Sequence, residues 1–284
     1  MSADTHADLL RRGAATLQAA GLNDPRAEAR RLLCLVAGYS AATLISREQD
    51  VASDDLQAGF EMAVGMRSER QPFAHISGWA DFYGLRLRSD GRALIPRADS
   101  ECVVDLALER IPEQAVWHIA DLGTGSGALL AALLSHRSAA RGTAIEQSAA
   151  AASLAAENFE HLKLDPRIML LHGSWAGWTD WGDCDLIISN PPYIRSQVIP
   201  DLAPEVRDFD PVEALDGGDD GLDAYREIIT LAAQQMKGGA HLVFEIGYDQ
   251  KDIVANLLEM AGFQQLTHRQ DLGGNDRAIA ATKS

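Results

Sequence analysis

After residue 115 the sequence alternates apolar, strand-like runs with helical segments, and this alternation constrains the fold more than any other feature. Helical segments such as "GALLAALLSHR" and "SAAAASLAAENFEHL" separate the early runs. The expected strands are "AVWHIADL" (115–122), "GTAIE" (142–146), "IMLLHG" (168–173), "CDLIISN" (184–190), "AHLVFEIG" (240–247), a run near 265 and "RAIAATK" (277–283). The pattern predicts an α/β fold, Rossmann-like, with a seven-stranded and mostly parallel sheet covered by helices on both faces.

The first hundred residues follow two other patterns. Residues 4 to about 70 place apolar side chains every three or four positions, and Asp24-Pro25 resembles a helix N-cap followed by proline. We therefore expect an N-terminal helical domain at 1–70. The aromatic- and glycine-rich stretch 71–98 predicts a β-hairpin linker with its turn at Ser89–Gly91, and residues 99–284 form the α/β domain.

Composition limits the kinds of partner. The chain carries 41 acidic and 25 basic side chains, a net charge of −16, which argues against a surface that neutralises nucleic-acid phosphates. Its three cysteines form no CxxC pair, so we expect no disulfide framework and no metal. A signal-peptide pattern and long apolar runs are missing from the sequence, so a cytoplasmic protein without membrane contact is expected.

The stretch "DLGTGSGALL" places three glycines, Gly123, Gly125 and Gly127, between a strand and a helix. Glycines there let the backbone turn tightly and approach a ligand. Glu146, at the end of the second strand, suits a ribose hydroxyl, so we predict a nucleoside-like cofactor. Because the loop also fits a dinucleotide fingerprint through Ala128, the loop alone leaves NAD and S-adenosylmethionine open.

The stretch "NPPY", Asn190 to Tyr193, follows the fourth predicted strand and favours S-adenosylmethionine. In an open α/β sheet the ligand lies where the strand order reverses, which brings strands one and four together. The side-chain carbonyl of Asn190 and the backbone carbonyl of Pro191 could accept hydrogen bonds from an amide or amine nitrogen. Tyr193 would offer a flat face to a planar group. The alternative is a loop that is merely stiff.

Taken together, "LIPRADSE", "DLGTGSGAL", "NPPYI" and "GGDDGLDAYREI" resemble the release factor glutamine methyltransferases over nearly the whole chain. The resemblance implies methyl transfer from S-adenosylmethionine, with S-adenosyl-L-homocysteine as product, to the glutamine of the Gly-Gly-Gln motif in peptide-chain release factors. A monomer acting on these protein partners is expected. The implied cofactor residues are Gly123, Thr124, Gly125, Ser126, Gly127, Glu146, Trp175 and Asn190. The implied substrate-binding residues are Asn190, Pro191, Pro192 and Tyr193, of which Asn190, Pro191 and Tyr193 would be catalytic.

Three positions depart from the family pattern. Ser174 stands where the family often has an aspartate before the tryptophan, and Ala98 and Ser100 replace a proline and a threonine. These changes leave the proposed methyl-transfer residues intact. The long connection from Ile194 to Gly218 is expected to cover the substrate.

Two other functions use the same features. A DNA adenine-N6 methyltransferase would also use "NPPY", but it must hold a polyanion and flip a base, which the acidic composition disfavours. A non-catalytic cofactor-binding scaffold is the second alternative, and it predicts that Asn190 can be replaced without effect.

Overall fold

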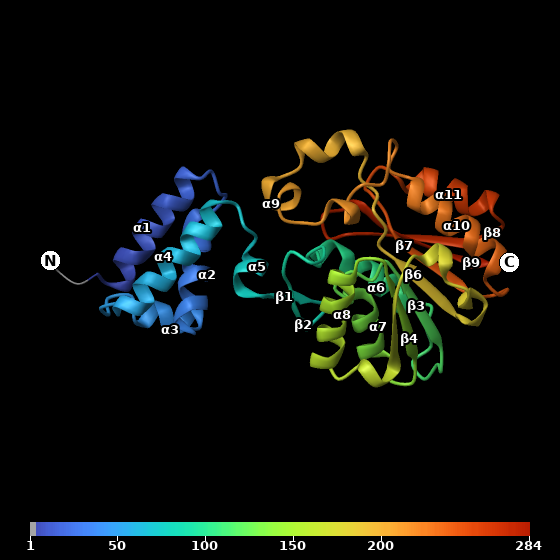
Figure 1. Cartoon of the computed structure of the whole chain (residues 1–284), viewed down its shortest axis with the longest axis horizontal. Coiled ribbons are helices and arrows are strands. Elements are labelled where there is room, and N and C mark those ends of the chain that lie inside the picture. Colours follow the sequence, from blue (N-terminus) through green and yellow to red (C-terminus); the bar gives the residue numbers. More distant parts are fainter. Residues whose placement is uncertain (1–3) are drawn as a thin grey trace. The chain divides into compact units, whose positions relative to one another are not determined.

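A computed structural model describes residues 4–284, which fold into two compact units (Figure 1). The first unit runs to Gly78 and also contains Pro204–Phe209, whereas the second comprises Trp79–Ala203 and Asp210–Ser284. The junction after Gly78 lies inside the predicted linker, 71–98. The sequence did not indicate that Pro204–Phe209, from the long connection after Ile194, belongs to the first unit.

The first unit is helical. The sequence prediction for Asp24 is confirmed, since its side chain accepts a hydrogen bond from the backbone N–H of Ala27 at 3.2 Å and Pro25 follows at the first helical position. Leu17, Leu33 and Phe60 are almost fully buried in its core. The helices are α1 (His6–Ala19), α2 (Pro25–Ala37), α3 (Ala41–Ser46), α4 (Asp54–Ser68), α5 (Phe73–Ser77) and α9 (Pro204–Arg207).

Ion pairs hold α9 within the first unit. Glu205 of α9 accepts hydrogen bonds from Arg67 at 3.2 Å and from Arg70 at 2.9 Å. Arg67 also bonds Glu28 of α2 at 3.0 Å, and its side chain is only 11% exposed. Because these guanidinium and carboxylate groups are partly buried, water screens their attraction less than that of fully exposed ion pairs.

The second unit is built on a seven-stranded sheet with the order β5-β4-β3-β6-β7-β9-β8. All neighbours are parallel except the pairs made by β9, which runs antiparallel to β7 and β8. The predicted α/β fold with seven strands is confirmed. Its strands are β3 (His118–Leu122), β4 (Arg141–Glu146), β5 (Ile168–His172), β6 (Leu186–Ser189), β7 (His241–Glu245), β8 (Phe263–Gln270) and β9 (Asp276–Lys283).

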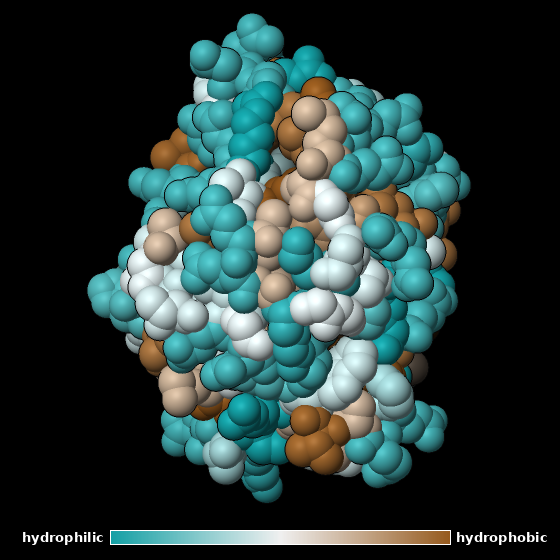
Figure 2. Space-filling model, turned by 90° about the vertical axis from the view of Figure 1, so that its right-hand side faces the viewer, coloured by the Kyte–Doolittle hydropathy of each residue, from teal (hydrophilic) through white to brown (hydrophobic). Residues whose placement is uncertain are grey.

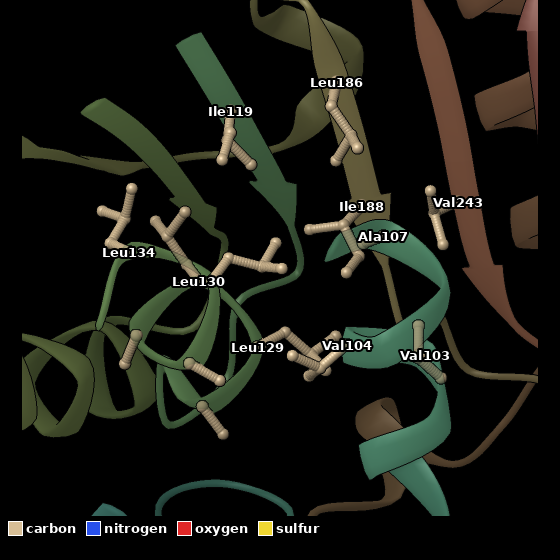
Figure 3. Close-up of a cluster of buried hydrophobic side chains, with 14 of the residues drawn as sticks. Val103, Val104, Ala107, Ile119, Leu129, Leu130, Leu134, Leu186, Ile188 and Val243 are labelled. Carbon is tan, nitrogen blue, oxygen red and sulfur yellow. The ribbon is translucent and has the colours of Figure 1, made fainter. Parts of the chain in front are cut away.

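Helices pack on both faces of this sheet, as the alternation predicts (Figure 1). One face meets α6 (Glu101–Leu108), α7 (Ala128–His136) and α8 (Ala149–His161); the other meets α10 (Asp223–Gln235) and α11 (Lys251–Met260). Figure 3 shows the first face, where Ile119, Ile188 and Val243 point from the strands toward α6 and α7. Successive strand residues alternate between the faces, so Ile187 belongs to the opposite core.

A two-stranded hairpin precedes the sheet, formed by β1 (Trp79–Phe82) and β2 (Leu85–Arg88). The chain does bend at Asp90 and turn at Gly91 and Arg92, close to the predicted Ser89–Gly91, but this turn does not join the two strands of the hairpin. The hairpin turn lies instead at Tyr83 and Gly84, whose φ angles of 50° and 75° both lie in the left-handed region that a tight two-residue hairpin turn requires. An Asp-Gly pair is a strong local turn signal, but the pairing of Phe82 with Leu85 decides the register.

The surface agrees with the acidic, polar composition. Figure 2 shows the side of the second unit that lies to the right in Figure 1, where hydrophilic residues predominate and hydrophobic ones form small separate groups. Within residues 4–284, no helix combines the length and the hydropathy needed to cross a bilayer.

Candidate active site

A cavity of about 1460 Å³ opens at the carboxyl ends of the central strands of the second unit. Because β3 lies between β4 and β6, the loops after these three strands meet there, as expected at a point where strand order reverses. Typical small-ligand pockets measure roughly 300–1,000 Å³, so this cavity has room for a cofactor together with a substrate side chain. Its lining includes Gly123–Ser126, Glu146, Ser174–Ala176, Asn190–Pro192, Arg92–Arg97 and residues 211, 213, 214 and 216.

The glycine loop after β3 is hydrogen-bonded to the neighbouring strand β4 and leaves open space on the side of the cavity. Gly123 and Thr124 donate their backbone N–H groups to the carbonyl of Ile145, at 2.9 and 3.1 Å. A Cβ added to Gly125 would meet no atom within 4 Å, whereas one added to Gly127 would lie 2.5 Å from the ring of Phe159. Gly125 therefore leaves space for a ligand, and Gly127 permits close packing of the loop against α8.

Glu146, at the end of β4, is tied to the glycine loop. Its Oε2 accepts from the backbone N–H of Gly125 at 2.8 Å, and its Oε1 accepts from that of Ser148 at 2.8 Å. The side chain lines the cavity and is largely buried. Since each carboxylate oxygen can accept a second hydrogen bond, Glu146 can still receive ligand hydroxyl groups from the cavity.

Asp121, which the sequence analysis did not single out, lies directly beneath the loop. Its Oδ2 accepts from the Thr124 hydroxyl at 2.6 Å, while its Oδ1 is buried without a hydrogen-bond partner among residues 4–284. Burial raises the pKa of Asp121 to about 7, against the opposing hydrogen bond from Thr124. Asp121 is the first residue of "DLGTGSG", so its place at the end of the strand before the glycine loop could have been read from the sequence.

Trp175 begins a short 3-10 turn, Trp175–Gly177, after β5. Its indole N–H donates to Glu227 of α10 at 2.7 Å, and its ring lies 3.3 Å from the position of a Cβ on Gly123. Ser174 also lines the cavity, and its hydroxyl accepts from the backbone N–H of Ala176 at 3.2 Å, so it caps this turn. Trp175 thus provides an aromatic wall beside the glycine loop.

The four residues of "NPPY" divide between two environments. Asn190, Pro191 and Pro192 line the cavity. The side-chain amide of Asn190 makes no hydrogen bond to any residue in the described part of the chain, 4–284, so it is available to a ligand. Tyr193 is not part of the lining; its hydroxyl donates to Glu245 at 3.1 Å and its ring packs against the core of α10 and α11.

The segment Arg92–Arg97 forms another wall of the cavity, and the sequence analysis used part of it only as a family motif. Arg97 lines the cavity and donates to Asp210 at 2.6 Å, and the Asp210 side chain is completely buried. Asp210 also accepts from the backbone N–H of Ile95 at 3.4 Å. One carboxylate from the long connection therefore fixes this wall. In residues 4–284, no three His, Cys, Asp or Glu side chains are arranged to hold a metal ion.

The sheet, the glycine loop with its acidic strand end and the "NPPY" loop together define a Rossmann-like methyltransferase. Residues 102–205 match the family model described as the methyltransferase small domain, and residues 8–78 match that of the PrmC N-terminal domain. A crystal structure of a methyltransferase from Pyrococcus furiosus superposes with a TM-score of 0.54 at 16% identity, covering 72% of this chain and 91% of that one. This likeness shows the fold.

Full-length relatives define the family more closely. The chain is 37% identical over 268 residues to a release factor glutamine methyltransferase of Caulobacter vibrioides, covering 94% of this chain and 93% of the relative. It is 39% identical over 276 residues to the protein of that description from Rhodospirillum rubrum, covering 97% of this chain and 84% of the relative. The chain belongs to the family of release factor glutamine methyltransferases.

Proposed function

We propose that this chain transfers a methyl group from S-adenosylmethionine to the side-chain amide nitrogen of the glutamine in the Gly-Gly-Gln motif of peptide-chain release factors. One observation carries the proposal: the glycine loop and Asn190–Pro192 line the same cavity, so a cofactor and an amide can meet there. Membership of the family supplies the substrate.

The residues around the glycine loop fit this cofactor. The open space above Gly125 allows close approach of a ligand, Glu146 has acceptor capacity for ribose hydroxyl groups, and the ring of Trp175 can pack on a purine. Gly123, Thr124 and Ser126 complete this side of the site. When bound, S-adenosylmethionine supplies a methyl group that its sulfonium already activates toward nucleophiles.

The "NPPY" loop orients the nucleophile. An amide nitrogen delocalises its lone pair into the π system of its carbonyl group and is therefore a weak nucleophile. Hydrogen-bond acceptors on its two N–H groups would stabilise the positive charge that develops on the nitrogen during attack. The side-chain oxygen of Asn190 and the backbone carbonyl of Pro191 are the proposed acceptors. The two prolines fix φ near −65° and so limit the positions these oxygens can take. With the cofactor bound, Asn190 and Pro191 would hold the nitrogen in line with the methyl group. The nitrogen would gain the methyl group, the cofactor would leave as S-adenosyl-L-homocysteine, and one amide proton would be lost after transfer.

The partners and location follow from this reaction. We propose a monomer in the cytoplasm that acts on a protein and has no direct nucleic-acid contact. All three cysteines are free thiols, with Cys102 and Cys184 buried, in keeping with a reducing compartment. The parts of the long connection that belong to the second unit, 194–203 and 210–218, are proposed to cover the bound glutamine.

The test is methyl transfer from labelled S-adenosylmethionine to a release factor, with DNA offered in a parallel reaction. We expect label on the release factor, none on DNA, and none when the motif glutamine is replaced. Asn190→Ala should lower kcat by about 100-fold or more, as removal of one oriented hydrogen-bonding group at a reacting centre does. Asn256→Ala on the exposed side of α11 is the matched control and should keep full activity. Label on DNA, or equal activity of both variants, would contradict the proposal.

A further inference from the structure

The loop that carries Asn190 and Pro191 is held on the side away from the cavity by two buried polar residues, Glu245 and Gln250. Glu245 ends β7, the neighbour of β6, and is 3% exposed. Gln250 is the N-cap residue of α11 and is 5% exposed. Most buried polar groups are hydrogen-bonded, so the partners of these two side chains indicate what they hold in place. Within residues 4–284, Oε2 of Glu245 has no partner, and its Oε1 makes the contact described next.

Glu245 holds the hydroxyl of Tyr193. The Tyr193 hydroxyl donates to Glu245 Oε1 at 3.1 Å and lies 3.5 Å from Nη1 of Arg277 on β9. Burial and the nearby Glu245 carboxylate raise the pKa of the Tyr193 hydroxyl above its usual value, so it remains a neutral donor. Arg277 in turn pairs with Asp271 at 3.3 Å. The tyrosine ring is thus fixed at its far end by a buried network.

Gln250 holds the backbone of the same residue. Its Nε2 donates to the carbonyl of Tyr193 at 3.0 Å and to that of Gly221 at 3.1 Å. Its Oε1 accepts from the backbone N–H of Gly247 at 2.9 Å and lies 3.5 Å from the Tyr225 hydroxyl. The Tyr225 hydroxyl gives its short hydrogen bond to the carbonyl of Glu245, at 2.8 Å. Both amide hydrogens of Gln250 and one acceptor position of its Oε1 are therefore used, which fixes the side chain in one orientation.

The segment 215–221 completes this arrangement and explains the glycines of "LDGGDDG". Ile194 donates its N–H to the carbonyl of Leu215 at 2.9 Å and accepts from Gly217 at 2.8 Å. A Cβ on Gly217 would lie 2.8 Å from the Pro192 carbonyl, and one on Gly221 would lie 2.4 Å from the Tyr193 carbonyl. Only glycine allows the segment to approach the loop this closely.

From this geometry we infer that Glu245 and Gln250 are positioning residues for methyl transfer: they hold Tyr193, and through it set the placement of the Asn190 and Pro191 oxygens. The inference rests on the proposed function. Misplacement of a reacting group by about 1 Å can lower the rate about 100-fold. Glu245 and Gln250 can therefore affect the rate of methyl transfer by fixing the loop, even though neither residue lines the cavity. The contacts made by the glycine loop and Glu146 do not involve them.

Hydrogen exchange of the free enzyme tests the positioning without any substrate. In Gln250→Ala we expect the two hydrogen-bonded backbone amides of 193–196, those of Ile194 and Ser196, to exchange at least about tenfold faster, because the loop loses its contact at the Tyr193 carbonyl. The amides of Gly123 and Thr124 should exchange as in the wild type. Val254→Ala, which opens a fully buried position on the same helix but removes no hydrogen bond to the loop, is the matched control and should leave 193–196 unchanged. Unchanged exchange of 193–196 in Gln250→Ala would overturn the inference.

Kinetics test the consequence for the reaction. We expect Gln250→Ala to lower kcat by about 10- to 100-fold while the Kd for S-adenosylmethionine stays at the wild-type value. Val254→Ala should keep its kcat. A variant whose loop exchanges faster but whose kcat is unchanged would refute the inference. A wild-type enzyme that fails to label a release factor refutes the proposed function instead, and the exchange result still decides whether the two residues hold the loop.

A double-mutant cycle assigns the role of Glu245. If Glu245 acts through the Tyr193 hydroxyl, Glu245→Ala should lower kcat in the wild type and have little further effect in Tyr193→Phe. Glu245→Gln keeps an acceptor for the Tyr193 hydroxyl and should retain most of the activity. If Glu245→Ala does not fold, the activity of Glu245→Gln is compared with that of Tyr193→Phe instead. Equal loss from Glu245→Ala in both backgrounds, or a Glu245→Gln variant as impaired as Tyr193→Phe, would exclude this role.

Discussion

Replacing either of two glycines in the loop after β3 with alanine should affect a different property of the protein. Gly125 and Gly127 both have positive φ angles, of 56° and 83°, but their surroundings differ. A methyl group on Gly125 would enter open space in the cavity, whereas one on Gly127 would overlap the ring of Phe159 on α8. We predict that Gly125→Ala weakens cofactor binding and that Gly127→Ala destabilises the fold.

The magnitudes follow from the geometry. A non-glycine residue in the left-handed region costs about 1–2 kcal/mol of stability, which is the whole cost expected for Gly125→Ala. Gly127→Ala adds overpacking, since its Cβ would lie 2.5 Å from Phe159 Cε1. Overpacking costs about 1–3 kcal/mol, so the total is about 2–5 kcal/mol. One extra methyl group in a ligand pocket costs about 1–3 kcal/mol of binding, or about 10- to 200-fold in Kd, for Gly125→Ala.

Urea unfolding and titration calorimetry with S-adenosylmethionine measure the two effects separately. We expect Gly125→Ala to lose affinity by at least about tenfold, and its urea midpoint should fall only by the amount that corresponds to about 1–2 kcal/mol, less than in Gly127→Ala. Gly127→Ala should show a clearly lower midpoint. If Gly125→Ala binds the cofactor as tightly as the wild type, the loop does not face the cofactor and the reasoning fails. A Gly127→Ala variant of wild-type stability would refute the packing argument.

Three further changes test the site. Glu146→Gln turns an NH₂ group toward the backbone N–H of Gly125 or Ser148, so calorimetry should show cofactor affinity lower by about 1–3 kcal/mol. Trp175→Phe loses the hydrogen bond to Glu227 and should weaken cofactor binding by about 0.5–1.5 kcal/mol in the same assay. The pKa of Asp121 is raised to about 7, so between its ordinary 3.8 and 7 the folded state binds more protons than the unfolded chain, and wild-type stability should fall as pH rises. Asp121→Asn should remove this fall, of about 2–3 kcal/mol between pH 5 and pH 8, in urea unfolding followed across that range.

Each of these predictions has a contradicting result. Unchanged calorimetric affinity in Glu146→Gln would show that this carboxylate does not receive the cofactor. Equal affinity of Trp175→Phe and the wild type would mean that the indole N–H does not orient the ring. A wild-type stability that stays level or rises between pH 5 and pH 8 relative to Asp121→Asn would contradict the raised pKa.

Local patterns predicted the framework because they act over short stretches of chain. The alternation of strands and helices predicted a parallel sheet, and the adjacency of strands one and four placed "NPPY" beside the glycine loop. Asp24 and Pro25 predicted a helix start for the same reason, since a cap bonds a backbone group three residues away. The hairpin turn was missed because Asp90-Gly91 carries a strong local signal, whereas strand pairing decided the register at Tyr83 and Gly84.

The sequence by itself determined the class of fold, and it singled out the glycine loop and the Asn190–Pro192 segment, which line one cavity. These depend on hydrophobic period, on glycine and proline backbone limits, and on the topology of parallel sheets. Only the tertiary structure decided that Tyr193 turns its hydroxyl to Glu245, that Gln250 bonds its carbonyl, and that Gly217 and Gly221 pack against the loop. Those contacts join residues up to 57 positions apart, as from Tyr193 to Gln250, and no local preference specifies which buried polar group will meet another.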